Sequence, residues 1–346
     1  RQALDARPAE GPQLRVITVR EHGGSELQYI WAEETRYDCR VSFRREMIDR
    51  LLRELLDSTA ANTPLVETLA SMLLPPELVA LPSARSYHLV VAGEAAALPW
   101  ELILAYQQNG LRAPVPVLRL LDGMHRPPGA ANASRDALLI GNPRTGATLS
   151  DEGGTESAPP PGAREELARL ARTLKSARLD SVISYGEDAK LVIDRLFSRA
   201  YRILLISGRA VREHRLPNKQ MVTGFVLSDG VFLTAREIEA MRIIPEVIVL
   251  NGHQAGHPGL TGEMVPQLLK AGVRCVLAPA WTVDERVSAA FLQRFFIALT
   301  DGERFEDACA NARRTAFEAA PELSTWAAYQ AWGDADFTLP PQPPPA

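Results

Sequence analysis

The chain has 346 residues, of which 46% are hydrophobic and 23% charged, and its formal net charge at pH 7 is −4. These values are typical of a soluble globular protein with a large core, and they exclude the global basic field that favours nucleic acid or anionic membrane. The three cysteines, Cys39, Cys275 and Cys309, are widely spaced, which argues against a disulfide framework and favours a reducing compartment. Because no apolar run has membrane-spanning length, we expect a cytoplasmic protein without nucleic-acid or membrane partners.

The first part of the chain, residues 1–135, predicts a smaller and partly helical subdomain. Residues 41–57 have the pattern of a helix, and residues 87–92 have that of a strand. We expect this subdomain to extend the sheet of the following domain. Trp100 and Trp281 are the expected core anchors at the junction.

Residues 136–339 alternate regularly between short apolar runs and segments of helical period. Residues 163–176 and 286–299 each place apolar side chains on one stripe, at spacings of three and four residues. Continuous apolar strands that alternate with amphipathic helices predict an α/β fold, a three-layer α/β/α sandwich around a mainly parallel sheet. The apolar runs that read as buried strands are 137–141, 181–185, 202–207, 246–250 and 273–279.

Two segments have the composition of loops or linkers. Residues 144–162 are rich in Gly, Ser and Pro and lie between the first strand of the sandwich and its helix, so they are either a functional loop or a disordered one. Residues 340–346 form a Pro-rich tail, which cannot pack as a helix or a sheet. Because the chain starts at Arg1 rather than Met, we expect it to be a piece of a longer protein.

The expected site lies beyond the carboxyl ends of the parallel strands, where ligands and catalytic groups gather in sheets of this kind. Two loops are expected there, "GRAVREHR" after residue 207 and "NGHQAGH" after residue 250. Since consecutive strands usually lie close together, we expect Arg209 and His253 to lie near each other. His253 and His257 form a weak metal candidate, because neighbouring glycines indicate a loop and the zinc-peptidase motif is absent.

Seven segments together give the chain a resemblance to a known family. It resembles the CHAT domain family, which is caspase-like and belongs to the clan CD cysteine peptidases related to separase and gingipain. The resemblance implies a caspase-like α/β/α sandwich. The segments, in the order of the family, are "ALPWELIL" (97–104), "LLIGNP" (138–143), "PGAREELARLARTL" (161–174), "GFVLSDGVFLTAREIEAMR" (224–242), "VIVLNGHQAG" (247–256), "LLKAGVRCVLAPAWTVDE" (268–285) and "WAAYQAWGD" (326–334).

The resemblance also implies a His/Cys dyad, and both of its positions are substituted here. In active members a histidine followed by glycine ends the third strand of the sandwich, and a cysteine ends the fourth. The matching residues are Arg209, Ala210 and His253. Peptide hydrolysis in this fold needs a thiolate and an imidazole that exchanges its proton. A guanidinium, with a pKa above about 12, cannot replace that imidazole, so the resemblance implies no catalytic residue.

What remains of the site is a candidate binding rim. Asp284 and Glu285 match a motif that in active relatives helps to receive a basic substrate side chain, and they would still suit an arginine or lysine of a partner. Alternatively, Asp284 caps the helix that starts near residue 286, or Arg209 reaches across to the acidic pair and fills the pocket from within. The candidate rim residues are Gly208, Arg209, Ala210, Gly252, His253, Asp284 and Glu285.

The sequence therefore predicts a catalytically inactive CHAT-type pseudo-peptidase, a protein-interaction scaffold or regulator in a bacterial defence or signalling pathway. Its partner would be a protein, such as an active peptidase or a sensor module, and no cofactor is implied. Two alternatives stay open. One is an enzyme with relocated chemistry, based on a metal at His253 and His257 or on Cys275 as the nucleophile of a hydrolase. The other is a sensor that binds an anion or a nucleotide at the Arg209 rim.

Overall fold

The computed structural model describes residues 14–123, 132–145, 162–216, 218–253 and 260–339. Three of the features considered above lie outside the described residues: His257, positions 146–161 of the Gly/Ser/Pro-rich segment, and the tail 340–346. Within the described ranges, no helix combines the length and the apolar content needed to cross a membrane.

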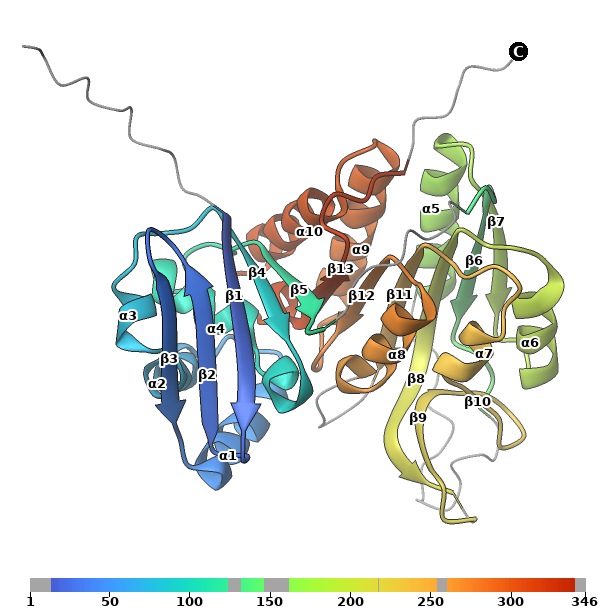
Figure 1. Cartoon of the computed structure of the whole chain (residues 1–346). Helices are drawn as coiled ribbons and strands as arrows, with labels where there is room; N and C mark the ends of the chain where they lie inside the picture. The colour runs from blue at the N-terminus through green and yellow to red at the C-terminus, as the bar shows by residue number, and fades with distance from the viewer. Residues whose placement is uncertain (1–13, 124–131, 146–161, 217, 254–259, 340–346) are drawn as a thin grey trace, which may run out of the picture.

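The described strands join in one mixed sheet that runs through the molecule (Figure 1). They are β1 (Leu14–His22), β2 (Glu26–Ala32), β3 (Arg36–Ser42), β4 (Ser86–Val91), β5 (Val117–Leu121), β6 (Asp136–Gly141), β7 (Asp180–Tyr185), β8 (Ile203–Arg215), β9 (Met221–Val226), β10 (Phe232–Leu233), β11 (Val247–His253), β12 (Cys275–Pro279) and β13 (Tyr329–Gly333). In the C-terminal half, parallel strands follow in the order β7, β6, β8, β11 and β12, and β13 is antiparallel to β12. β13 pairs with β5, and the sheet continues through β4, β1, β2 and β3.

Helices cover both faces of the C-terminal half of the sheet. The described helices are α1 (Arg45–Leu56), α2 (Thr63–Leu73), α3 (Pro76–Val79), α4 (Trp100–Asn109), α5 (Ala163–Ser176), α6 (Ala189–Ser198), α7 (Ala235–Glu239), α8 (Met264–Ala271), α9 (Glu285–Thr300), α10 (Phe305–Ala319) and α11 (Thr325–Ala328). α5, α9 and α10 lie on one face, and α6, α7 and α8 lie on the other (Figure 1). The predicted α/β fold with a mainly parallel central sheet is therefore confirmed.

Most elements of the C-terminal half match their predictions because their apolar patterns are continuous. α5 has the predicted bounds, and its buried stripe consists of Leu167, Leu170 and Leu174. α9 starts and ends one residue outside the predicted range 286–299. β6, β7 and β12 differ from the predicted runs by only one or two residues at one end, which is within the usual uncertainty of such boundaries.

The N-terminal half contains the predicted helix α1 and strand β4, and also a meander of β1, β2 and β3 that the sequence analysis did not predict. β1 and β2 alternate buried and exposed residues, so that Ile17 and Val19 face the core beside Leu27 and Tyr29. Two glycines with positive φ angles make the turn between these strands. Period-two alternation on both sides of a Gly-Gly turn was the signal available in the sequence.

A cluster of buried charges lies where the two halves meet. Glu101, at the start of α4, forms an ion pair with Arg119 of β5, and both side chains are fully buried. The Arg119 guanidinium also donates to two main-chain carbonyls, at 2.8 and 2.9 Å. Trp100 and Trp281 are buried, as predicted for core anchors. Glu101 and Trp100 of the segment "LPWELI" thus have a structural role in closing this junction.

Candidate functional site

The segment 208–215, expected to be a loop, belongs to strand β8, and the first three residues of the second expected loop, 251–253, belong to β11. β8 continues through "GRAVREHR" to Arg215, and β11 continues to His253. The extension of β8 pairs with β9 in the antiparallel sense, with Ala210 opposite Phe225. This pairing satisfies main-chain groups of a polar segment, which an apolar run in the sequence does not reveal. The prediction of a loop at residues 208–215 is therefore wrong.

The register of β8 and β11 brings together the two positions that the resemblance matches to the dyad. Arg209 and His253 are Cα partners, where the pairing of the two strands ends. Partners in neighbouring strands lie about 5 Å apart across the sheet. The expected proximity of Arg209 and His253 is thus confirmed for the main chain.

Gly208 is required by the packing beside this pair. A Cβ atom at this position would lie 2.8 Å from Cδ of Pro143, in the segment that follows β6. The same segment is held against β8, because the Asn142 N–H donates to the Ser207 carbonyl at 2.7 Å. A residue without a side chain therefore allows the segment after β6 to pack against β8 directly beside the candidate rim.

A cavity of about 670 Å³ opens at this edge of the sheet, between the first turns of α5 and α9. Its volume is in the range of small-ligand sites. Residues at the end of β6, in the middle of β8 and near the end of β11 form its floor. Among the described residues, its lining includes Asp284 and Glu285 but not Arg209. The described polar residues that line it are Asn142, Glu166, Arg169, Ser207, Asn251, Asp284, Glu285, Arg286, Ser288 and Gln293.

A chain of hydrogen bonds runs along the floor of this cavity. The Asn251 amide donates to Ser207 Oγ at 3.2 Å, and its oxygen accepts from the Tyr329 hydroxyl at 2.8 Å. The same hydroxyl lies 2.5 Å from Ser288 Oγ. Tyr329 is fully buried and stacks on Phe291, with ring centroids 4.2 Å apart. Burial raises the pKa of the Tyr329 hydroxyl, so this chain is polar but uncharged at neutral pH.

Carboxylates stand on the wall of the cavity. Asp284 Oδ1 accepts the N–H of Val287 at 2.9 Å, which confirms that Asp284 caps α9. Glu285 follows in the first turn and is exposed. Desolvation raises the pKa of the half-buried Glu166; Arg169 lowers it, and the charge of Glu285 adds to the rise. A basic group in the cavity would meet these three carboxylates, one of which is poorly solvated, beside the guanidinium groups of Arg169 and Arg286, which line the cavity as well.

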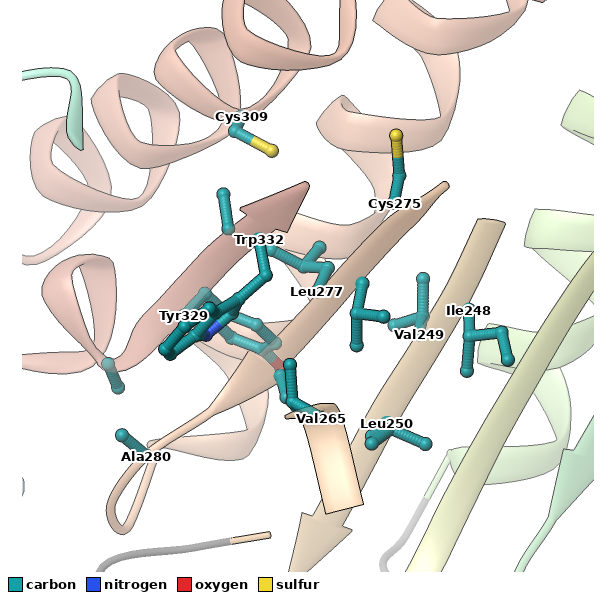
Figure 2. Close-up of a cluster of buried hydrophobic side chains, with 14 of the residues drawn as sticks. Ile248, Val249, Leu250, Val265, Cys275, Leu277, Ala280, Cys309, Tyr329 and Trp332 are labelled. Carbon is teal, nitrogen blue, oxygen red and sulfur yellow. The ribbon is translucent and has the colours of Figure 1, made fainter. Parts of the chain in front are cut away.

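The structure places Cys275 far from this rim. Its Cα partner in β11 is Val247, and His253 lies six residues further along that strand, about 20 Å away at about 3.3 Å per residue. Cys275 and Cys309 belong to one cluster of buried hydrophobic side chains (Figure 2). Burial raises the pKa of both thiols, that of Cys309 to about 12. Because the thiolate is the reactive form, the geometry does not support a hydrolase based on Cys275.

The metal hypothesis gains no support from the described side chains. Among them, no group of three or more His, Cys, Asp or Glu residues is arranged to hold a metal ion. Of the candidate pair, His253 is placed by its main chain in β11, and His257 lies outside the described residues. A metal at these histidines stays a prediction.

The polar floor was missed by the sequence analysis. Asn251 follows the apolar run 246–250 directly, and an amide that is buried with that run needs partners, which was the signal available in the sequence. Its partner Tyr329 lies 78 residues away along the chain. The sequence places Glu166 in the amphipathic helix 163–176 and gives no sign that it lines a cavity. The fold alone brings these side chains to one cavity.

Comparisons with known proteins give one family match and remote structural likenesses. The model of the family described as "CHAT domain" matches residues 63–334, and the match therefore begins within the subdomain expected at 1–135. A comparison with curated protein sequences found no match.

Three of the solved structures that resemble the chain differ strongly from it in sequence. Two structures of the Saccharomyces cerevisiae separase–securin complex have 14% identity, TM-scores of 0.41 and 0.40, and a match to 72% of this chain. The chain spans only 15% and 16% of those chains. A complex of the pro- and mature domains of RgpB from Porphyromonas gingivalis has 10% identity and a TM-score of 0.48, covering 86% of this chain and 77% of that one.

Proposed function

This chain belongs to the CHAT domain family, and we propose on that premise that it is a pseudo-peptidase that acts by binding a protein partner. The observation that carries the proposal is the register of β8 and β11, which pairs Arg209 with His253. If these are the dyad positions of the family, a guanidinium stands in place of the general base and an imidazole in place of the nucleophile.

None of the three cysteines has the properties of a nucleophile for peptide hydrolysis. Cys275 and Cys309 are buried and carry raised thiol pKa values. Cys39 lies on the edge strand β3 at the other end of the sheet, and desolvation together with Glu77 raises its thiol pKa as well. A nucleophilic cysteine needs a lowered pKa and an accessible position close to an imidazole. None of the three meets this combination.

Binding does not depend on the dyad, and the cavity beside it keeps an acidic wall. Glu166, Asp284 and Glu285 line a space large enough for an arginine or lysine side chain. Asp284 is committed to the cap of α9 through one oxygen, so Glu166 and Glu285 are the residues best suited to meet a cation. A cation beside Glu166 would also favour its charged form and so oppose the rise in pKa that desolvation causes.

The proposed role is that of a scaffold or regulator in bacterial defence or signalling. Support comes from family membership and from a cavity that could hold a basic side chain of a partner without cleaving its chain. The proposed partner is a protein such as an active peptidase or a sensor module, which presents an exposed arginine or lysine to the cavity.

Loss of catalysis is tested with fluorogenic peptides that carry Arg or Lys before the cleaved bond. We expect no turnover by the purified protein. We expect measurable turnover from the variant that combines Arg209→His, Ala210→Gly and His253→Cys. This variant places a thiol and an imidazole base at paired positions of β8 and β11 without other changes to the fold. The variant with His253→Cys alone supplies a thiol without its base and is the matched control. Turnover by the unmodified protein that a thiol reagent abolishes would contradict the proposal.

Binding is tested separately with a labelled peptide that contains a single arginine, followed by fluorescence anisotropy. We expect saturable binding that weakens about tenfold or more when Glu166→Gln and Glu285→Gln are combined, since two charge-assisted contacts are lost. The control combines Glu54→Gln and Glu239→Gln, which remove the same charge from exposed positions on α1 and α7. Equal binding by both double variants would exclude the acidic wall as the binding element. Proteins captured from the native organism by the control but not by the cavity variant would identify the partner.

A further inference from the structure

A second cavity, separate from the candidate site, is lined by three arginines. It has a volume of about 340 Å³ and lies between the segment before β5 and the C-terminal half of α10. Arg112, Arg313 and Arg314 line it, and Glu318 is the only carboxylate among its described lining residues. It shares no described lining residue with the cavity at the ends of β6, β8 and β11. The remaining wall is apolar and includes Val115 and Phe317.

Arg313 is buried but incompletely paired. Only 1% of its surface is exposed, and its two terminal nitrogens donate to the carbonyls of Val117 and Tyr329, at 2.8 and 2.9 Å. Its Nε has no hydrogen-bond partner among the described residues. A buried N–H group without a partner costs free energy, so this guanidinium is not fully compensated by the fold.

The charge of Arg313 is also weakly compensated. The nearest carboxylate, Glu101, lies 3.6 Å away and is already engaged in its closer pair with Arg119, so two buried guanidinium groups share one carboxylate. Glu306 contributes from further away, but it faces His88 at 3.2 Å. Burial lowers the pKa of Arg313, and the positive charge of Arg119 acts in the same direction. An anion in the adjoining cavity would reduce this excess of positive charge.

The mouth of the cavity offers further positive charge. Arg112 and Arg314 are exposed, and the described residues provide neither of them with an ion pair. Guanidinium groups match the planar carboxylate and the phosphate through paired N–H donors. The volume exceeds that of a bare ion, and the ring of Phe317 offers contact to an apolar body.

We propose that this cavity binds a small organic oxyanion, in which a carboxylate or phosphate is attached to an apolar body. The oxyanion meets Arg112 and Arg314 at the mouth and the charge of Arg313 below, and the apolar body packs against Val115 and Phe317. The proposal is independent of peptide binding at the acidic cavity, because the two sites have different residues and opposite charge.

The test uses isothermal titration calorimetry with phenyl phosphate and benzoate, which carry the two oxyanions on the same aromatic ring. Inorganic phosphate and acetate are the counterparts without the apolar body. We expect saturable binding of at least one aromatic probe, with at least tenfold weaker binding of its small counterpart. Whichever aromatic probe binds more tightly distinguishes a phosphate ligand from a carboxylate ligand.

The variant that tests the site combines Arg112→Gln and Arg314→Gln, which are exposed and leave the buried Arg313 in place. We expect its affinity for the aromatic probe to fall at least tenfold. The control combines Arg85→Gln and Arg172→Gln, which remove the same charge from exposed positions elsewhere and should leave the affinity unchanged. Circular dichroism of both variants checks that they are folded. No saturable binding of either aromatic probe, a small counterpart that binds as tightly, or an equal loss in both variants would overturn the proposal.

Discussion

Two groups of charged side chains in this molecule differ in how their charges are compensated. At the junction of the two halves, Glu101 and Arg119 are fully buried and bind each other directly. At the ends of the strands, Glu166 and Glu285 line an open cavity and act on each other as like charges. The first arrangement holds the fold together, and the second leaves charge available to a ligand.

The two groups also differ in how closely they are tied to the core of the fold. Glu101 and Trp100, which belong to a segment that carries the family resemblance, are buried residues of the junction, so their position indicates a role in stability. Arg209 and His253 lie where the pairing of two strands ends, and the half-buried Arg209 does not belong to the hydrophobic core.

The largest effect is expected when the junction is broken. Glu101→Gln keeps the shape of the side chain but leaves Arg119 and Arg313 buried without a carboxylate. We expect the free energy of unfolding, measured by urea denaturation, to fall by about 3–5 kcal/mol. The control is Asp194→Asn, which breaks the exposed ion pair with Lys190 and should change stability far less. A loss at Glu101 no larger than that of the control would show that the junction is not the structural element described above.

The sequence predicted those parts of the fold whose side-chain patterns are continuous. α5 has an unbroken apolar stripe, and β6 and β7 are short apolar runs, so local periodicity was sufficient. The extension of β8 to Arg215 could not be predicted, because its polar residues form a strand only through pairing with β9. The meander of β1–β3 was missed although its alternation was present, since isolated alternation is a weaker signal than a long amphipathic helix.

The candidate site was predictable in position but not in composition. The site was expected just after residues 207 and 250, and the register of β8 and β11 brings Arg209 and His253 together there. The floor of the cavity depends on Asn251 and Tyr329, which are 78 residues apart and meet only in the folded chain. Long-range hydrogen bonds of this kind have no local signature in a single sequence.

A smaller loss is expected when the floor of the cavity is opened. Asn251→Ala removes the acceptor of the buried Tyr329 hydroxyl and the donor to Ser207. Because buried polar groups then lack partners, we expect a loss of about 1–3 kcal/mol in the free energy of unfolding. Asn218→Ala, at an exposed position, is the matched control. If both variants unfold at the same urea concentration as the unmodified protein, the hydrogen-bond chain does not stabilise the fold.

The two roles of Asp284 can be separated by a pair of substitutions. Asp284→Ala removes the cap of α9 and should lower the free energy of unfolding by about 1 kcal/mol. Asp284→Asn keeps a capping side chain and removes the charge, so its stability should stay close to that of the unmodified protein. Thermal unfolding of both variants measures the difference. If Asp284→Asn is as destabilised as Asp284→Ala, the charge of Asp284, and not its capping oxygen, is what α9 requires.

The smallest effect, and one of opposite sign, is expected at Glu166. Its pKa is raised in the folded protein above the ordinary value of 4.5, mainly by desolvation, so the folded state holds this proton more tightly than the unfolded state. The chain therefore loses stability as the pH rises from about 4.5 through the raised pKa, because an unfavourable charge must then form in the cavity.

Glu166→Gln removes that charge. We expect a gain of less than about 1 kcal/mol at pH 7 that disappears below pH 4, as measured by urea denaturation across this range. Glu54→Gln, at an exposed position on α1, should show no such trend. A loss of stability at pH 7 would mean that the attraction between Glu166 and Arg169 outweighs desolvation. Glu166 would then be paired within the fold, as Glu101 is at the junction, and would not be available to a ligand.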